Sequence, residues 1–446
     1  MKRILVIGAG RSCTSLIKYF LEHSDEQGWK ITVADISKDL CDRKVSGHPN
    51  GSSLKFDVNN DELRQKAIQE HDHIVSMLPA HMHVSVAKDC IRFKKNMSTA
   101  SYISPEMKAL NDEAVEAGVT IMNEIGVDPG IDHISAMRVL DGIREKGGKI
   151  HQFESFTGGL LAPECENEPW NYKFTWNPRN VVLAGQGSAV KFLQEGKYKY
   201  IPYQRVFRRT EFIDIEGIGR FEGYANRDSL SYREVYGLED VQTIFRGTLR
   251  RPGYCRSWNV FVMIGATDDS YTLEGSKDMS HREFINTFLP YHPSDSVELK
   301  LAHYLSIPQD MDVMDRLKAA GIFSEEKIGL EHDASPAFIL ETILKKVWTL
   351  DPKDKDMIVM WHKFGYTLNG VKHKLESSMV CIGDDMENTA MAKTVGLPLA
   401  IATRMMINGR ISQKGVIMPL KPEAYNSILD ELAENGIQFT EKEIEL

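Results

Sequence analysis

ILVIGAGRSC, residues 4–13, is the stretch that decides the fold of this chain. Its four branched apolar residues are typical of a buried parallel strand, and the helical pattern of Leu16, Ile17, Phe20 and Leu21 follows the glycines. A strand, a glycine turn and a helix N-terminus together form an anion site, because backbone N–H groups point at a phosphate that glycine lets approach. The stretch therefore predicts a dinucleotide-binding domain. Its third fingerprint position holds Cys13, which is still small enough for the helix to pack on the strand.

Strand and helix patterns continue to alternate after this stretch. The expected strands are 31–34, 54–58, 73–78, 97–100 and 119–123, and the expected helices are 62–70, 82–91 and 105–117. Such alternation predicts right-handed crossovers in a doubly wound parallel sheet, an α/β Rossmann domain. Ligands of this fold bind at the carboxyl ends of the strands.

The pattern changes after about residue 130. Further strands are expected at 153–157, 212–215 and 259–265, helices within 281–350, a hairpin turning at Asn369-Gly370, and a helix at 387–395 that stops at Gly396. We therefore expect three parts. They are a Rossmann domain of residues 1–128 plus about 385–410, a mixed α/β substrate domain of 129–280 plus about 351–384 and 411–446, and an inserted helical subdomain of 281–350.

Composition narrows the class of protein. The chain has 446 residues, of which 42% are hydrophobic, and a net charge of −9, which argues against nucleic acid or an anionic membrane as a partner. Its six cysteines are scattered without ligand spacing, so we expect reduced thiols and no metal site. The start of the chain leads directly into a strand and no apolar stretch has the length of a membrane span, so we expect a cytoplasmic protein.

Asp35, at the end of the second expected strand, bears on the choice of cofactor. A carboxylate at this place accepts both ribose hydroxyls of NAD and repels the 2′-phosphate of NADP. The alternative is a turn residue that opens the loop Asp35-Ile36-Ser37. Several nearby residues offer groups that would hold a 2′-phosphate: Arg11, Ser37, Lys38, Arg43 and Lys44.

Two further clusters could bind a substrate. In NEIGVDPGIDH, residues 123–133, Asp128 is either a helix N-cap or a carboxylate for a substrate ammonium, whereas Asp132 and His133 are expected to serve helix entry and packing. Arg227 and the segment from Arg246 to Arg251 are either solvated or bind carboxylates bidentately, and several arginines imply a substrate with more than one carboxylate.

Seven stretches together carry a family resemblance: TASYISPEM (99–107), NEIGVDPGIDH (123–133), FTGGLLAPE (156–164), YANRDS (224–229), FRGTLR (245–250), GIFSEEKI (321–328) and TAMAKTVGLPLAIA (389–402). Through them the chain resembles the saccharopine dehydrogenases of the L-glutamate-forming type. The resemblance covers nearly the whole chain. It implies a Rossmann domain, a mixed domain that binds saccharopine and forms a homodimer, and a helical domain that can close the cleft.

The resemblance also implies roles for individual residues. The implied cofactor site consists of Gly8, Gly10, Arg11, Ser12, Cys13, Asp35, Ser37, Asp57, Val58, Met77, Leu78, Pro79, Ser101, Ile125 and Val127. The implied substrate site consists of Ser101, Tyr102, Asp128, Arg227, Arg246, Gly247 and Thr248. Asp128 and Tyr102 are the candidates for acid–base catalysis, with His133 or a bound water as alternatives.

The implied reaction is the reversible oxidation of saccharopine to L-glutamate and 2-aminoadipate 6-semialdehyde in lysine metabolism. The family usually uses NADP, whereas Asp35 favours NAD, so the sequence leaves NADP or NAD open. Two alternatives also stay open. A carboxynorspermidine dehydrogenase would need fewer arginines, and a non-enzymatic nucleotide sensor would lack a substrate domain with convergent arginines.

Overall fold

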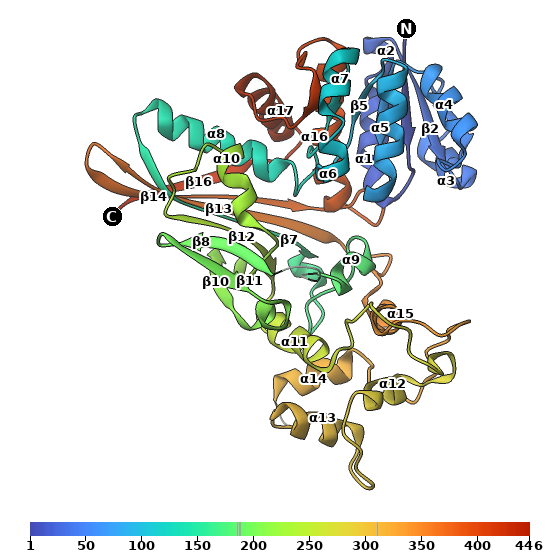
Figure 1. Ribbon diagram of the computed structural model, residues 1–446, viewed down its shortest axis with the longest axis vertical. Helices are drawn as coiled ribbons and strands as arrows, with labels where there is room; N and C mark the ends of the chain where they lie inside the picture. The colour runs from blue at the N-terminus through green and yellow to red at the C-terminus, as the bar shows by residue number, and fades with distance from the viewer. Residues whose placement is uncertain (185, 187–188, 310) are drawn as a thin grey trace. The chain divides into compact units, whose positions relative to one another are not determined.

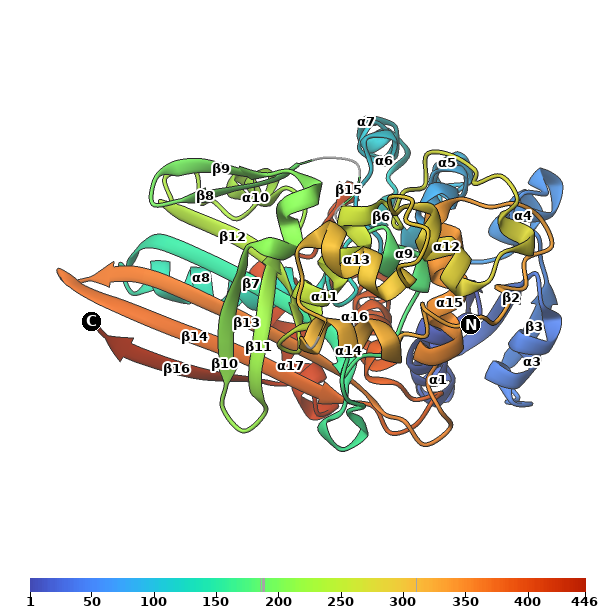
Figure 2. The same ribbon diagram turned by 90° about the horizontal axis from the view of Figure 1, so that it is seen from below.

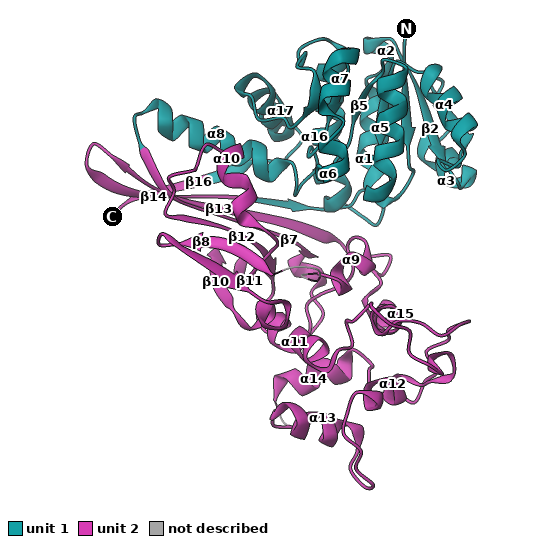
Figure 3. Cartoon of the chain, viewed as in Figure 1, with its two compact units in different colours: residues 1–148, 379–440 teal, residues 149–378, 441–446 magenta. Residues whose placement is uncertain are grey.

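The computed structural model describes residues 1–184, 186, 189–309 and 311–446. The chain forms two compact units: residues 1–148 with 379–440, and residues 149–378 with 441–446 (Figure 3). Compared with the expected domains, residues 129–148 and 411–440 lie in the first unit. Residues 411–440 lie there because β15 (Gly415–Ile417) pairs in parallel with β6 (Thr120–Met122) and so adds a strand to the first sheet.

The first unit contains a parallel sheet, which confirms the predicted fold class. In the described part of the chain its seven strands have the order β15-β6-β5-β4-β1-β2-β3. The strands not yet given are β1 (Lys2–Ile7), β2 (Trp29–Asp35), β3 (Gly51–Lys55), β4 (His73–Ser76) and β5 (Asn96–Ser98). The order turns back at β1, which neighbours both β2 and β4, and this switch point is where doubly wound sheets bind ligands.

Helices of the first unit fall into two groups, as expected when a sheet is covered on both faces. One group contains α1, α3 and α16, and the other contains α4, α5, α6 and α7 (Figure 1). The helices are α1 (Thr14–Glu22), α2 (Ser24–Gln27), α3 (Lys38–Val45), α4 (Asp61–Gln69), α5 (His83–Arg92), α6 (Pro105–Lys108), α7 (Asn111–Ala117), α8 (Ile131–Glu145), α16 (Ala390–Ile407) and α17 (Pro422–Glu434). Strand β1 is buried on both faces, and its Leu5 and Ile7 join the core cluster that includes α4 and α5.

Helix α16 corrects one prediction. The helix was expected to end at Gly396, but it continues to Ile407 with Pro398 inside. Gly396 serves packing, because a Cβ there would lie 2.8 Å from the backbone nitrogen of Leu16 in α1. The helix is long and apolar enough to cross a membrane, but 72% of it is buried within the structure, as in a core helix.

The second unit is built on a mixed sheet. In the described residues its main path has the order β10-β11-β12-β7-β13-β14-β16, and β8 joins from β12 with β9 beside it (Figure 2). The strands are β7 (Lys149–Leu161), β8 (Val190–Gln194), β9 (Lys197–Ile201), β10 (Thr210–Ile215), β11 (Gly219–Ala225), β12 (Thr243–Arg250), β13 (Asp356–Leu368), β14 (Val371–Ile382) and β16 (Phe439–Glu445). The predicted hairpin is confirmed, since Asn369 and Gly370 have φ of 50° and 83°, as a type I′ turn requires.

The helices of the second unit are α9 (Pro178–Val182), α10 (Tyr232–Val235), α11 (Tyr254–Ile264), α12 (His281–Thr287), α13 (Val297–Leu305), α14 (Asp312–Ala319) and α15 (Pro336–Trp348). Four of them, α12 to α15, lie within 281–350 as expected, whereas α9, α10 and α11 were not predicted. The strand expected at 259–265 is wrong, because these residues belong to α11 and end at Gly265 with φ of 88°. Trp258 and Phe261 are buried on this helix among aromatic rings, and a short apolar run does not distinguish a buried helix from a strand.

Candidate cofactor and substrate site

The glycine loop follows β1 and enters α1 through a short 3₁₀ turn, Arg11–Cys13. Gly8 has a φ of 108°, and a Cβ at this position would lie 2.7 Å from the carbonyl oxygen of Met77. Gly10 has a φ of −66°, and a Cβ added to it would meet no atom of the described chain within 4 Å. The first glycine therefore lets two strand ends approach, and the second leaves room for a ligand against the backbone.

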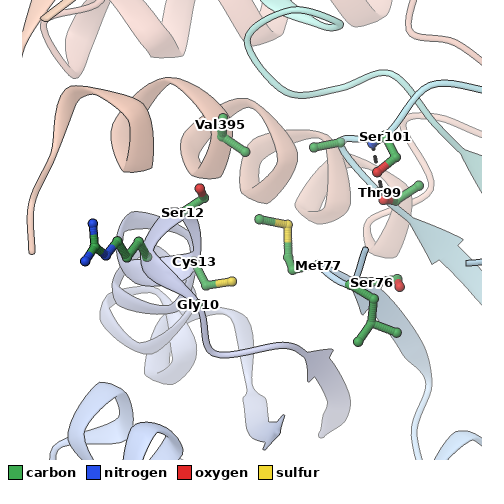
Figure 4. A pocket seen from close by; sticks show the side chains of 11 residues that line it. Gly10, Ser12, Cys13, Ser76, Met77, Thr99, Ser101 and Val395 are labelled. Carbon is green, nitrogen blue, oxygen red and sulfur yellow. Dashed lines mark hydrogen bonds between the residues drawn. The ribbon is translucent and has the colours of Figure 1, made fainter. Parts of the chain in front are cut away.

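A pocket of about 210 Å³ opens at this loop, entirely within the first unit (Figure 4). It is lined by Gly10, Arg11, Ser12, Cys13, Ser76, Met77, Leu78, Thr99, Ala100, Ser101 and Val395. In Figure 4, Ser12 lies on the glycine-loop side, Met77 lies between Cys13 and Ser101, and Val395 comes from α16. The pocket thus brings together seven of the fifteen residues that were predicted to bind the cofactor: Gly10, Arg11, Ser12, Cys13, Met77, Leu78 and Ser101.

Four lining residues were not among the predicted site residues. Thr99 and Ala100 lie at the same strand end as Ser101, and Ser76 directly precedes Met77, so the rule that ligands bind at strand ends points to all three. Val395 had no such signal, because it reaches the pocket only through the packing of α16 on α1.

Cys13 lines the pocket but is an inert thiol. Its side chain is buried, and burial raises the pKa of the thiol to about 12. The group therefore stays protonated at neutral pH, which argues against a nucleophilic role. Its small size serves the packing of the helix on the strand.

Other predicted cofactor residues do not line this pocket: Gly8, Asp35, Ser37, Asp57, Val58, Pro79, Ile125 and Val127. Val58, Ile125 and Val127 are buried apolar residues. The Asp57 carboxylate accepts a hydrogen bond from the backbone nitrogen of Asn59, 2.9 Å away, and so forms the turn that follows β3. Their assignment to the cofactor stays a prediction.

Asp35 binds its own domain with both carboxylate oxygens. Oδ2 accepts a hydrogen bond from the backbone nitrogen of Ala9 at 2.8 Å, and Oδ1 accepts one from the backbone nitrogen of Ser37 at 3.0 Å. The side chain therefore ties the glycine loop to the turn after β2. This contact gives the carboxylate a structural task, so its presence is no longer an argument for NAD by itself.

The cationic side chains near the turn after β2 differ in whether another side chain already binds them. Lys38 pairs with Asp42, and Lys44 donates to the Thr14 hydroxyl. Arg11 and Arg43 are exposed, and within the described residues no ion pair is found for either guanidinium. An open glycine loop, a helix N-terminus without a side-chain cap and an exposed Arg11 fit a phosphorylated dinucleotide.

Tyr102 and Asp128 are brought together in the first unit. The Tyr102 hydroxyl donates to Asp128 Oδ1 over 2.9 Å, and both residues are partly exposed. Glu124, which has a φ of 55° and is buried, accepts a hydrogen bond from the backbone nitrogen of Ile103 and contacts His133 Nε2 at 2.8 Å. His133 is fully buried, in line with its expected packing role, and Glu124 fixes the loop that carries Tyr102.

The arginine segments meet in the second unit. The backbone nitrogen of Asn226 donates to the carbonyl of Arg246, and the Ser229 hydroxyl accepts from the Arg246 nitrogen. Arg246 is buried and stacks on Tyr232 at 4.3 Å, whereas Arg227 is exposed.

The remaining residues of the two segments have packing roles. A Cβ on Gly247 would lie 2.2 Å from the Phe156 ring, and Thr248 on β12 pairs with Tyr224 on β11. Arg250 is buried among the rings of Tyr172, Tyr224 and Tyr254, so it belongs to the aromatic core of the unit. Substrate contacts of Arg227, Arg246, Gly247 and Thr248 stay predictions.

No metal centre is found in the part of the chain that the structure describes, where no group of three His, Cys, Asp or Glu side chains is placed to hold an ion. Within the same residues, all six cysteines are thiols that form no disulfide.

Two family models together match nearly the whole chain. Residues 4–122 match the family model described as saccharopine dehydrogenase NADP binding domain, and residues 126–437 match the saccharopine dehydrogenase C-terminal domain. The chain is 32% identical to the saccharopine dehydrogenase [NADP(+), L-glutamate-forming] of Schizosaccharomyces pombe, with 100% of both chains covered. It is 32% identical to the alpha-aminoadipic semialdehyde synthase of Bos taurus, but spans 47% of that longer protein.

Solved structures also match this chain over its full length. The apo saccharopine dehydrogenase (L-Glu forming) of Saccharomyces cerevisiae matches with a TM-score of 0.89 and 30% identity over 100% of both chains. The homospermidine synthase of Legionella pneumophila matches with a TM-score of 0.58 at 10% identity over 100% of this chain and 91% of that one, which shows a shared fold alone. The family models and the full-length relatives show that this chain belongs to the saccharopine dehydrogenase family.

Proposed function

We propose that the chain is an NADP-dependent oxidoreductase that converts saccharopine reversibly to L-glutamate and 2-aminoadipate 6-semialdehyde. The observation that carries this proposal is the full-length similarity to L-glutamate-forming enzymes, which includes both the cofactor domain and the C-terminal domain. A small-molecule substrate follows from this class of enzyme. The homospermidine synthase likeness does not favour a polyamine substrate, because it reaches only the fold.

The choice of NADP rests on the family of the N-terminal domain and on the geometry around Asp35. Its carboxylate accepts two backbone N–H groups, and the exposed Arg11 and Arg43 offer charge for a 2′-phosphate. When bound, the cofactor supplies the hydride acceptor or donor of the reaction. Gly8 and Gly10 shape its phosphate site, and Ser101 lines the same pocket from the end of β5.

Tyr102 and Asp128 are the groups we assign to the proton chemistry. Oxidation at the lysine Cε of saccharopine gives an imine, water adds, and the carbinolamine collapses to the amine of glutamate and an aldehyde. A secondary ammonium must lose its proton before the oxidation, and the Asp128 carboxylate is suited to bind that ammonium. The Tyr102 hydroxyl, hydrogen-bonded at 2.9 Å, orients the carboxylate and can pass a proton to it.

A matched pair of variants tests this assignment. Tyr102→Phe should lower kcat with saccharopine by about 10²-fold or more, the usual effect of losing an acid–base group. Tyr425→Phe is the control, because Tyr425 donates to Asp141 over 2.8 Å in the same unit, and neither Tyr425 nor Asp141 was predicted to bind substrate or cofactor. If both variants turn over saccharopine at the wild-type rate, Tyr102 has no part in the chemistry.

Three further properties belong to the same proposal. We infer a homodimer, a cytoplasmic location and the absence of nucleic-acid or membrane partners, supported by the family, the reduced cysteines and the net charge of −9. Light scattering on the purified chain tests the first: a mass of two chains is expected, and a mass of one chain contradicts it. Cell fractionation tests the location.

A further inference from the structure

A buried histidine that no sequence motif singled out lies behind the cofactor pocket. His83, the first residue of α5, is 3% exposed. Its Nδ1 lies 2.8 Å from the Ser76 hydroxyl, and its Nε2 lies 2.7 Å from the Ser101 hydroxyl. Ser76 and Ser101 both line the pocket, so the imidazole connects the ends of two neighbouring strands beneath it.

His83 is a neutral imidazole in this environment. Burial lowers its pKa to about 4, with a smaller contribution from the charge of His81. A neutral imidazole carries one N–H donor and one bare nitrogen acceptor. Nε2 also lies 3.5 Å from the Thr99 hydroxyl, a longer contact than its 2.7 Å to Ser101. The ring donates through one nitrogen and accepts through the other, which gives the Ser76 and Ser101 hydroxyls opposite polarity.

The surroundings of Ser76 decide which way this chain of hydrogen bonds runs. Ser76 is fully buried, and among the described residues its hydroxyl has one partner, His83. If His83 donated to it, the Ser76 proton would be left without an acceptor, which costs about 1–3 kcal/mol for a buried group. The Ser76 hydroxyl therefore donates to Nδ1, and Nε2 carries the proton.

We propose that His83 is a positioning residue for the cofactor: its Nε2–H donates to Ser101 Oγ, so that the Ser101 O–H is directed into the pocket toward an acceptor on the bound dinucleotide. Ser101 is the partly exposed member of the three, so its hydroxyl is the best placed to meet a ligand in the pocket. The inference rests on the proposed function for the identity of the ligand, but the hydrogen-bond chain is independent of the substrate.

The structure offers a matched control. His73 on β4 is 2% exposed and contacts the Ser98 hydroxyl through Nε2 at 3.0 Å, and Ser98 continues to Thr403 on α16. Neither His73 nor Ser98 lines the pocket. His73→Asn therefore removes a histidine–serine hydrogen bond of the same kind from the same sheet without touching the cofactor.

The test is a double-mutant cycle read by NADPH binding. His83→Asn retains an amide near Nδ1 but cannot reach Ser101, and we expect it to weaken NADPH binding by about 3- to 10-fold. Ser101→Ala should show the same loss, and the double variant should be no weaker than Ser101→Ala alone. His83→Gln places its amide near Nε2 and should restore most of the affinity, whereas His73→Asn should leave it unchanged.

Two results would overturn the proposal: losses that multiply in the double variant, or an equal loss in His73→Asn. If His83→Asn does not fold, nitrogen NMR of the wild-type imidazole keeps the test open, because Nε2–H is expected and the Nδ1–H form contradicts it. Binding of NADPH needs no saccharopine. A wild-type chain that binds NADPH with this pattern but does not oxidise saccharopine therefore refutes the proposed function alone.

Discussion

The two glycines of the loop should respond in opposite ways to the same substitution. Gly8→Ala places a side chain at a φ of 108°, and left-handed backbone costs a non-glycine residue about 1–2 kcal/mol. Its Cβ would also lie 2.7 Å from the Met77 carbonyl oxygen, and relieving such overpacking costs about 1–3 kcal/mol. We therefore expect Gly8→Ala to lower the free energy of unfolding by about 2–5 kcal/mol.

Gly10→Ala should leave the fold intact. The φ of −66° suits alanine, and no described atom lies within 4 Å of its Cβ, so stability should rise by about 0–1 kcal/mol. The new methyl group would occupy the space beside the loop where a phosphate must approach the backbone. Affinity for NADPH should therefore fall by about tenfold or more, which corresponds to about 1.4 kcal/mol.

Urea unfolding and fluorescence titration with NADPH separate the two effects. Gly8→Ala should shift the unfolding midpoint, and Gly10→Ala should shift only the binding constant. Wild-type NADPH affinity in Gly10→Ala would refute the assignment of the pocket to the cofactor. An unchanged unfolding midpoint in Gly8→Ala would show that the close approach of the loop to Met77 is not essential.

Three further predictions concern specificity and pH. If Asp35 faces the ribose, Asp35→Ser should raise the NADPH:NADH ratio of kcat/KM by about tenfold for each 1.4 kcal/mol of repulsion removed. The same ratio in the variant and the wild type would show that Asp35 serves only the turn. Arg227→Ala should weaken saccharopine binding by about tenfold or more and leave NADPH affinity unchanged, as measured by calorimetry. The control is Arg220→Ala, because Arg220 is also exposed. If the two variants bind saccharopine equally well, Arg227 does not bind the substrate. Burial lowers the pKa of His73 to about 3 and that of His83 to about 4, so the unfolded chain binds more protons below pH 6.5. The free energy of unfolding, measured with urea, should therefore fall as the pH drops from 6.5 toward 4, by at most about 1.4 kcal/mol per pH unit for each histidine. The fall should be less steep in His73→Gln. A free energy of unfolding that does not change with pH would contradict the burial of the two histidines as neutral groups.

The sequence predicted those parts of the site that depend on local pattern. The glycine loop and the strand ends at Met77 and Ser101 follow from where buried strands end. Asp128 follows from its place after the last strand of the domain, whereas Tyr102, its hydrogen-bond partner, came from the family resemblance. The type I′ turn at Asn369-Gly370 follows from its two positive φ angles, a purely local requirement.

What the sequence did not predict depends on contacts between distant segments. Gly396 was interpreted as a helix stop, but it allows α16 to pack on Leu16, and this packing also brings Val395 to the pocket. The run at 259–265 became a helix because its apolar side chains pack among aromatic rings from other elements. His83 carries no motif, and only the fold shows that it lies between Ser76 and Ser101.

Identification of the products formed from saccharopine tests the central claim most directly. The purified chain should reduce NADP⁺ only when saccharopine is added, and mass spectrometry should find L-glutamate and 2-aminoadipate 6-semialdehyde in amounts equal to the NADPH formed. A chain that reduces NADP⁺ faster with carboxynorspermidine, or that forms no glutamate from saccharopine, would contradict the proposed function.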